Sequence, residues 1–320
     1  MMAGRLYLLL CGFLLIQCSE TTTSTRDSNI EYFPNYKWNQ IALADTLVFS
    51  IESFKSDVFQ NPETYVAFTG LEVFIGSDAE IVELEFYRNR SGLIFDTSKY
   101  RIYSYSDSTI RESVLPYDDF RELNFPDFHS KILYWDNNLH FIDSMNQFSS
   151  YNLDQENVTP IITNLTDDLE LISNAANWFF FKAGNQIKLL DVNNISAGLV
   201  DSNLPTNSLT AAAVANNGTI FVGTSRSKVF KSTDDGRTWE ETWPEPIFAN
   251  IVTDLEILTS GEIYLSVLGG GIYSSLDEGD TWHSIDQPNL NLVIYDVDYS
   301  YQFGLLVATS SGIYQLVEIQ

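Results

Sequence analysis

Short apolar stretches alternate with polar turns along most of the chain, and the turns are rich in Gly and Asn. β-Branched and aromatic residues dominate the apolar stretches. No long segment places apolar residues at the i, i+3, i+4 and i+7 spacing of an amphipathic helix. Because the helical spacing is missing while strand formers are frequent, the pattern predicts an almost entirely β protein.

The apolar stretches recur as versions of one unit. Copies of one strand stand at 63–70, 91–98, 137–144, 176–183, 218–225, 261–268 and 303–310. A further strand follows each copy after a tight turn, and an inner strand precedes it, most clearly at 209–216, 251–258 and 293–300. Seven repeats of about 39 residues match the size of a four-stranded propeller blade. The sequence therefore predicts a seven-bladed β-propeller of four-stranded antiparallel blades, with six larger blades as the alternative.

The last of these repeats reaches Gln320 directly after its third strand. The stretch at 37–44 begins with Lys37 and Trp38 and lies just before the first inner strand. We expect it to pair with the third strand of the final blade, near Gly312 to Val317. Such an N-terminal strand closes the ring and removes an exposed sheet edge.

One turn motif, Ser-x-Asp-x-Gly-x-Thr-Trp, occurs twice in the chain. Its residues are Ser232, Asp234, Gly236, Thr238 and Trp239, and then Ser275, Asp277, Gly279, Thr281 and Trp282. Alignment of the repeats places Asp78 and Asp107 at the same position, as two partial copies. The motif resembles the Asp-box, or BNR repeat, of sialidases, sortilin-type receptors, xyloglucanase-type glycoside hydrolases and a propeller-fold photosystem assembly factor. That resemblance implies a hairpin between the third and fourth strands of a blade, away from the ligand-binding mouth.

The motif residues have local structural tasks. The Asp234 carboxylate can accept hydrogen bonds from the following turn, and Gly236 can supply a positive φ. Thr238 can tie its hydroxyl back to the strand of Ser232, and Trp239 can wedge between neighbouring sheets. The second copy carries the same tasks, so all ten residues are expected to be structural rather than catalytic.

The first residues are typical of an export signal. An apolar run from Leu6 to Ile16 follows Arg5 and is too short to cross a bilayer as a helix. Leu15-Ile16-Gln17-Cys18 resembles the lipobox of bacterial lipoproteins, although Gln17 departs from it. Residues 1–17 are thus predicted to be a lipoprotein signal, Cys18 the lipidated residue, 18–35 a flexible tether and 36–320 one propeller domain. An ordinary signal peptide that is cut a few residues later is the alternative.

The composition and motifs favour few kinds of chemistry. A formal net charge of −26 opposes nucleic-acid binding. No zinc-type spacing connects His129, His140 and His283, and no cofactor motif is found, so no metal or cofactor is expected. Tyr100-Arg101-Ile102-Tyr103 lacks the Pro of the sialidase Arg-Ile-Pro motif, and an arginine triad is hard to assemble.

Acidic residues on the candidate inner strands leave a second possibility open. Asp254, Asp296 and Asp298, with Glu256, could form an acidic funnel, as in glycosidases that use paired carboxylates. The simpler interpretation is that these acids are turned toward water. We therefore expect a monomeric, outer-membrane-anchored lipoprotein of a bacterial cell envelope that binds or assembles a protein or glycan ligand without catalysis. A carbohydrate-active hydrolase or lyase is the alternative.

Overall fold

The computed structural model shows an all-β ring. It describes residues 36–42, 50–55, 63–68, 73–76, 81–83, 92–96, 99, 101–106, 109–114, 120–128, 130–166, 169–206, 208–242, 250–285, 293–300 and 304–318. The described strands form seven four-stranded sheets, which we number as blades in chain order. The predictions of an all-β propeller and of four-stranded antiparallel blades are confirmed.

The first three blades contain β2–β5, β6–β9 and β10–β13. Blade 1 has β2 (Ser50–Lys55), β3 (Glu63–Phe68), β4 (Val73–Gly76) and β5 (Ile81–Glu83). Blade 2 has β6 (Gly92–Asp96), β7 (Arg101–Ser106), β8 (Thr109–Val114) and β9 (Arg121–Glu122). Blade 3 has β10 (Leu133–Trp135), β11 (Asn138–Ile142), β12 (Phe148–Asn152) and β13 (Asn157–Ile162).

The next three blades contain β14–β17, β18–β21 and β22–β25. Blade 4 has β14 (Leu169–Ala175), β15 (Trp178–Ala183), β16 (Gln186–Asp191), the 3₁₀ turn η2 (Val192–Ala197) and β17 (Val200–Asp201). Blade 5 has β18 (Leu209–Val214), β19 (Ile220–Thr224), β20 (Val229–Ser232) and β21 (Glu240–Glu241). Blade 6 has β22 (Val252–Ile257), β23 (Ile263–Val267), β24 (Gly271–Ser275) and β25 (His283–Ser284).

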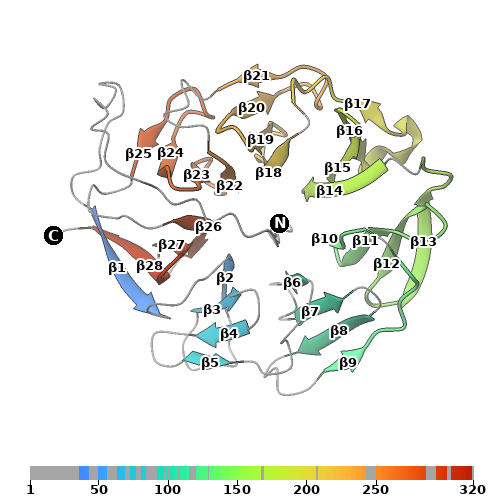
Figure 1. The fold of residues 1–320 in the computed structure, drawn as a ribbon, viewed down its shortest axis with the longest axis horizontal. Coiled ribbons are helices and arrows are strands. Elements are labelled where there is room, and N and C mark those ends of the chain that lie inside the picture. Colours follow the sequence, from blue (N-terminus) through green and yellow to red (C-terminus); the bar gives the residue numbers. More distant parts are fainter. Residues whose placement is uncertain are drawn as a thin grey trace.

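Blade 7 joins the two ends of the described chain. It contains β26 (Ile294–Ser300), β27 (Gly304–Thr309) and β28 (Gly312–Glu318), with β1 (Tyr36–Ala42) as its outer strand. β1 pairs antiparallel with β28, so that Tyr36 lies opposite Glu318 and Lys37 opposite Val317. This is the predicted closing pair, and Figure 1 shows the blue β1 beside the red β28.

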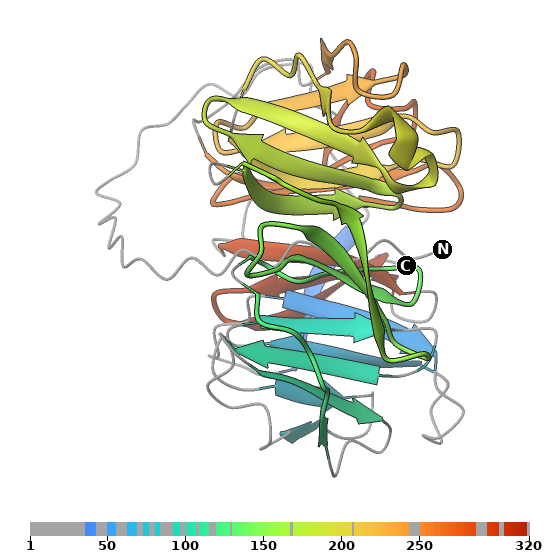
Figure 2. The same cartoon turned by 90° about the vertical axis from the view of Figure 1, so that its right-hand side faces the viewer.

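The ring has two faces that differ in their connections (Figure 2). Each blade runs from its inner to its outer strand with antiparallel neighbours. The turns from first to second and from third to fourth strands therefore share one side, which we call the motif face because it carries both Ser-x-Asp-x-Gly-x-Thr-Trp turns. The turns from second to third strands and the links between blades form the opposite crossover face. None of the described helical segments is long and apolar enough to cross a membrane.

The apolar core lies between the blades. One cluster joins Phe148 of blade 3 to Phe179 of blade 4, and the next joins Leu189 of blade 4 to Phe230 of blade 5. Another joins Phe221 of blade 5 to Trp282 of blade 6. The sheets of blades 3 to 6 thus bury both of their faces against their neighbours, which explains why their strands are apolar over much of their length.

One part of the predicted repeat alignment is wrong. The copy at 91–98 was expected to be a second strand, but β6 is the inner strand of blade 2. Asp107 consequently falls in the turn between Ser106 and Thr109, which joins the second and third strands, and it cannot be a motif equivalent. Asp78 falls between β4 and β5, as predicted, and both acids lie outside the described residues.

Candidate functional site

The two motif turns share one hydrogen-bond pattern. In blade 5, Asp234 Oδ1 accepts from Ser232 Oγ (2.9 Å) and from the Thr238 N–H (2.8 Å), and Asp234 Oδ2 accepts from Thr238 Oγ1 (2.6 Å). In blade 6, Asp277 accepts the corresponding bonds from Ser275 and Thr281 at 2.9, 2.8 and 2.6 Å. Both carboxylates are engaged inside their own turns, and each Thr hydroxyl donates to the Asp of its turn rather than to the strand of the Ser.

The same bonds favour the charged carboxylate. The Thr238 hydroxyl and N–H, followed by Ser232, lower the pKa of Asp234 to about 2. Burial alone would raise the pKa of Asp277, but the bonds from Thr281 and Ser275 bring it below its ordinary value. A hydrogen bond to the ionised form lowers a carboxyl pKa, so both acids are poorly suited to donate or accept protons near neutral pH.

Gly and Trp of each motif pack on the preceding blade. Gly236 has φ +77°, and a Cβ there would lie 2.7 Å from Leu189 Cδ2 of blade 4. Trp239 Nε1 donates to the carbonyl of Ser202 in blade 4 at 2.6 Å. Trp282 is 4% exposed and packs with Phe221 of blade 5. Each motif therefore fastens its blade to the one before it.

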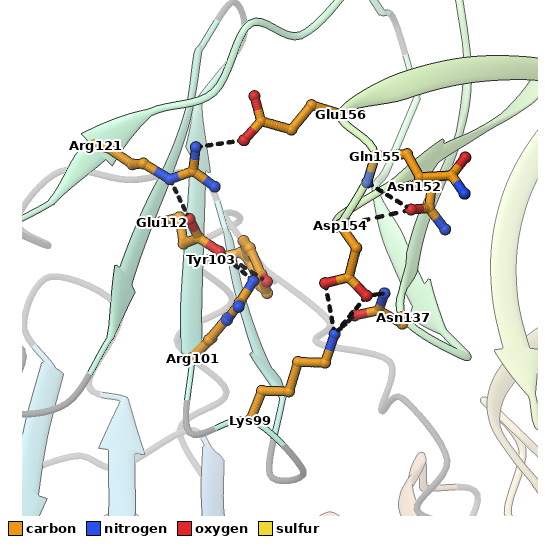
Figure 3. A network of polar contacts seen from close by, with 10 residues as sticks. All are labelled: Lys99, Arg101, Tyr103, Glu112, Arg121, Asn137, Asn152, Asp154, Gln155 and Glu156. Carbon is orange, nitrogen blue, oxygen red and sulfur yellow. Dashed lines mark hydrogen bonds and ion pairs between the residues drawn. The ribbon is translucent and has the colours of Figure 1, made fainter.

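A polar network that the sequence analysis did not find joins blades 2 and 3 on the motif face (Figure 3). Glu112 is only 3% exposed and accepts from Arg101 Nη1 (2.8 Å), Tyr103 Oη (3.2 Å) and Arg121 Nε. Arg121 Nη1 also reaches Glu156 Oε1 of blade 3 at 2.6 Å. Lys99 Nζ of blade 2 lies 2.7 Å from Asp154 Oδ1 of blade 3.

Part of this network could have been recognised in the sequence. The dipeptide Arg-Glu occurs at 111–112 and again at 121–122. Antiparallel pairing of β8 with β9 sets Arg111 opposite Glu122 and Glu112 opposite Arg121. The dipeptides could have been recognised as complementary once both were assigned to neighbouring strands.

The inner-strand acids do not form an open funnel among the described residues. Asp254 lies on β22 and Asp296 and Asp298 lie on β26, all on inner strands as predicted. However, Asp296 is 7% exposed and Asp298 is 4% exposed. Two of the predicted funnel acids are therefore shielded from water, whereas Asp254 is half-buried.

The described histidines are not gathered into a site. His140 is buried against Phe148 and Phe179, and burial lowers its pKa to about 4. His283 lies on the outer strand β25, and His129 is outside the described residues. Within the described part of the chain, no group of three or more His, Cys, Asp or Glu could hold a metal ion.

The stretch from Asp107 to Ser130 is mostly part of blade 2. It contains β8 and β9, so it is not one insertion. Phe125 packs on Phe141 and Tyr151, with ring centroids 4.5 and 4.9 Å apart, and Phe128 meets Phe125 edge-on. These two rings cover the core and form no exposed aromatic patch. Phe120 lies under the Arg111 guanidinium, and Tyr117 is outside the described residues.

Comparison with known proteins shows the fold. No protein-family model matches the chain, and no curated protein sequence matches it. A streptogramin B lyase structure is similar with TM-score 0.65 and 15% identity, over 89% of this chain and 98% of the lyase. YCF48 bound to D1 peptide is similar with TM-score 0.64 and 12% identity, over 93% of this chain and 100% of YCF48.

A third similar structure is the extracellular domain of a hybrid two-component system protein from B. thetaiotaomicron. It has TM-score 0.65 and 14% identity, and the match covers 87% of this chain but 39% of that one. These structures confirm the propeller.

Proposed function

We propose that this chain is an exported, non-catalytic binding or assembly module of the bacterial cell envelope, with a protein or peptide as its ligand. The motif turns are then an Asp-box used for construction, Cys18 the lipid-anchored residue, 18–35 its tether and 36–320 a single domain. A glycan ligand, the monomeric state and the outer-membrane location remain parts of the same hypothesis.

The pairing of β1 with β28 carries the proposal. Tyr36 lies opposite Glu318, at the end of the third strand of blade 7, and this end belongs to the motif face. The described chain therefore begins at the motif face, where the proposed tether 18–35 would attach. An anchor at the far end of that segment would leave the crossover face, with its loops, turned away from the membrane and open to partners.

The structural neighbours are compatible with a binding role, since one of them was solved with a peptide bound and another is an extracellular domain.

The alternative of a lyase or hydrolase has less support. One virginiamycin B lyase was made inactive by replacing a histidine. In this chain His140 is buried among aromatic rings, and His283 lies on an outer strand. Of the inner-strand acids, Asp296 and Asp298 are buried.

A cysteine-labelling experiment tests the proposal. Asn185→Cys places a thiol in the turn between β15 and β16 on the crossover face, and Ser260→Cys places one between β22 and β23 on the motif face. Both original residues are exposed. Peptide and glycan arrays would be screened with the full mature chain, before and after a bulky maleimide is attached.

We expect saturable peptide binding that is blocked by the label at 185 and unaffected by the label at 260. Blocking only at 260 would show that the ligand face is assigned wrongly. Turnover of a glycan without any peptide or protein binding would refute the module in favour of the enzyme.

A further inference from the structure

Nearly all cations with described side chains are paired with carboxylates. Ion pairs engage Lys99, Arg101, Arg111, Arg121, Lys182, Lys188, Lys228, Lys231 and Arg237. Lys131 and Arg226 are the exceptions within the described ranges. Both lie on the crossover face, since Lys131 precedes the inner strand β10 and Arg226 is in the turn between β19 and β20.

Lys131 lies near a weakly satisfied pair. Glu170 of β14 stands opposite Lys182 of β15, and their charged atoms are 3.9 Å apart. The side chains of Glu170 and Lys182 are 62% and 40% exposed. Leu133, Leu169 and Leu171 share one apolar cluster, which holds the starts of β10 and β14 together. Glu170 is therefore paired at long range with Lys182, and its charge also acts on Lys131 at the seam of blades 3 and 4.

Lys131 is half-buried, unlike a freely solvated lysine. Burial lowers the pKa of Lys131, and the charge of Glu170 offsets this only in part. A partly desolvated ammonium without a close counter-ion is costly, and an incoming carboxylate would remove part of that cost.

We propose that the crossover-face seam between blades 3 and 4 binds a carboxylate group of the peptide ligand, with Lys131 as the primary contact and Lys182 as the second. This inference rests on the proposed binding function and names the ligand chemistry. Because the chain carries a formal net charge of −26, an acidic peptide would be repelled from most of the surface. The two described lysines at this seam would attract the carboxylate locally and so select where such a peptide docks.

The test uses two neutral-flanked probe peptides, acetyl-Gly-Gly-Glu-Gly-Gly-amide and its Gln counterpart. NMR of the lysine side-chain Cε–Hε groups in the full mature chain would report on Lys131 directly during each titration. We expect a saturable shift with the Glu peptide and about tenfold weaker binding of the Gln peptide, because a charge-assisted bond is replaced by a neutral one.

Three variants distinguish binding at Lys131 from nonspecific electrostatic attraction of the peptide. Lys131→Met should weaken binding of the Glu peptide about tenfold, and Lys131→Arg should restore most of it, because it keeps the charge. Arg226→Gln is the matched control, since it removes one unpaired charge from the same face on another blade. We expect that change to weaken binding less than about twofold.

Equal binding of the two peptides, unchanged binding by Lys131→Met, or no response of Lys131 would each overturn the inference. If array peptides still bound the crossover face in those cases, the proposed function would stand without this site. If no peptide bound anywhere, the proposed function would fail as well.

Discussion

Blades 2 and 3 are joined differently from blades 4, 5 and 6. Between blades 2 and 3, Glu112 holds Arg101 and Arg121, and Arg121 and Lys99 reach across to blade 3. At the later seams, each motif turn satisfies its own carboxylate and sends a Gly and a Trp against the neighbouring sheet. Both kinds of seam bury apolar side chains, but the seam between blades 2 and 3 adds ion pairs around the buried Glu112, whereas the later seams add the Gly and Trp of the motif turns.

Neighbouring blades of one ring can therefore be joined by two different kinds of interaction. Apolar burial is not weakened by charge screening, and the carboxylate bonds of the motif turns stay within their own turns. Ion pairs across a seam are sensitive to screening wherever they are exposed. The two kinds of seam should therefore respond to different perturbations.

The largest effect should come from Trp282→Ala. Removing this 4% exposed side chain leaves a cavity between blades 5 and 6, and we expect the free energy of unfolding to fall by about 3–5 kcal/mol. Urea denaturation followed by far-UV circular dichroism measures the loss. Trp239→Ala, at a half-buried Trp, should cost less. Equal losses for both would show that burial is not what distinguishes the two motifs.

Glu112→Gln tests the charged seam. The change leaves Arg101 and Arg121 without their shared anion, and we expect a loss of about 1–3 kcal/mol, below that of a fully buried pair because Arg121 is 51% exposed. Glu122→Gln, which breaks only the exposed pair with Arg111, should cost less than about 0.5 kcal/mol. Hydrogen exchange should locate the Glu112→Gln effect in blades 2 and 3. A uniform effect around the ring would contradict a local seam.

Added salt should cause a smaller difference in stability between the two kinds of seam. Raising NaCl to about 1 M shortens the screening length to about 3 Å and should weaken the exposed Arg121–Glu156 and Lys99–Asp154 pairs, by at most about 1 kcal/mol together. Amide exchange in blades 2 and 3 should accelerate relative to blades 5 and 6. The double variant Lys99→Gln, Glu156→Gln should remove that difference, and its persistence would show that these pairs are not the cause.

Acid should weaken the motif turn of blade 5. The folded-state pKa of Asp234 is lowered to about 2, so its turn bonds stabilise the fold above the ordinary carboxyl pKa. That contribution is lost progressively as the pH falls from about 4 toward 2. The melting temperature of Asp234→Asn should therefore depend less on pH across this window than that of the parent protein. Parallel curves for the two would show that the Asp234 bonds do not favour the ionised form.

Much of the fold could be predicted from sequence because its units are local. Strand, turn and strand recur, and the closing pair of β1 with β28 followed from a missing outer strand. The misassigned strand in blade 2 shows the limit. Gly92–Asp96 is as apolar as a second strand, and only its partners in space identify it as the inner one.

The sites were harder to predict because they depend on which strands become neighbours. The motif turns are contained in eight consecutive residues, so their bonds could be anticipated. Glu112 and Arg121 meet only after β8 pairs with β9, and Lys131 and Glu170 approach only after two blades pack. The burial of Asp296 and Asp298 likewise depends on the neighbouring sheet and not on strand alternation.

The pairing of β1 with β28 also sets an order for biosynthesis. β1 is synthesised before the other described strands, yet it has no partner until β28 has formed on β27. Until translation has passed Glu318, blade 7 has no complete sheet, and the nascent chain presents an open edge that chaperones or an export apparatus can hold. The ring can therefore close only late in synthesis. A chain truncated near its C-terminus would leave the two ends of the ring unpaired and available for misassembly.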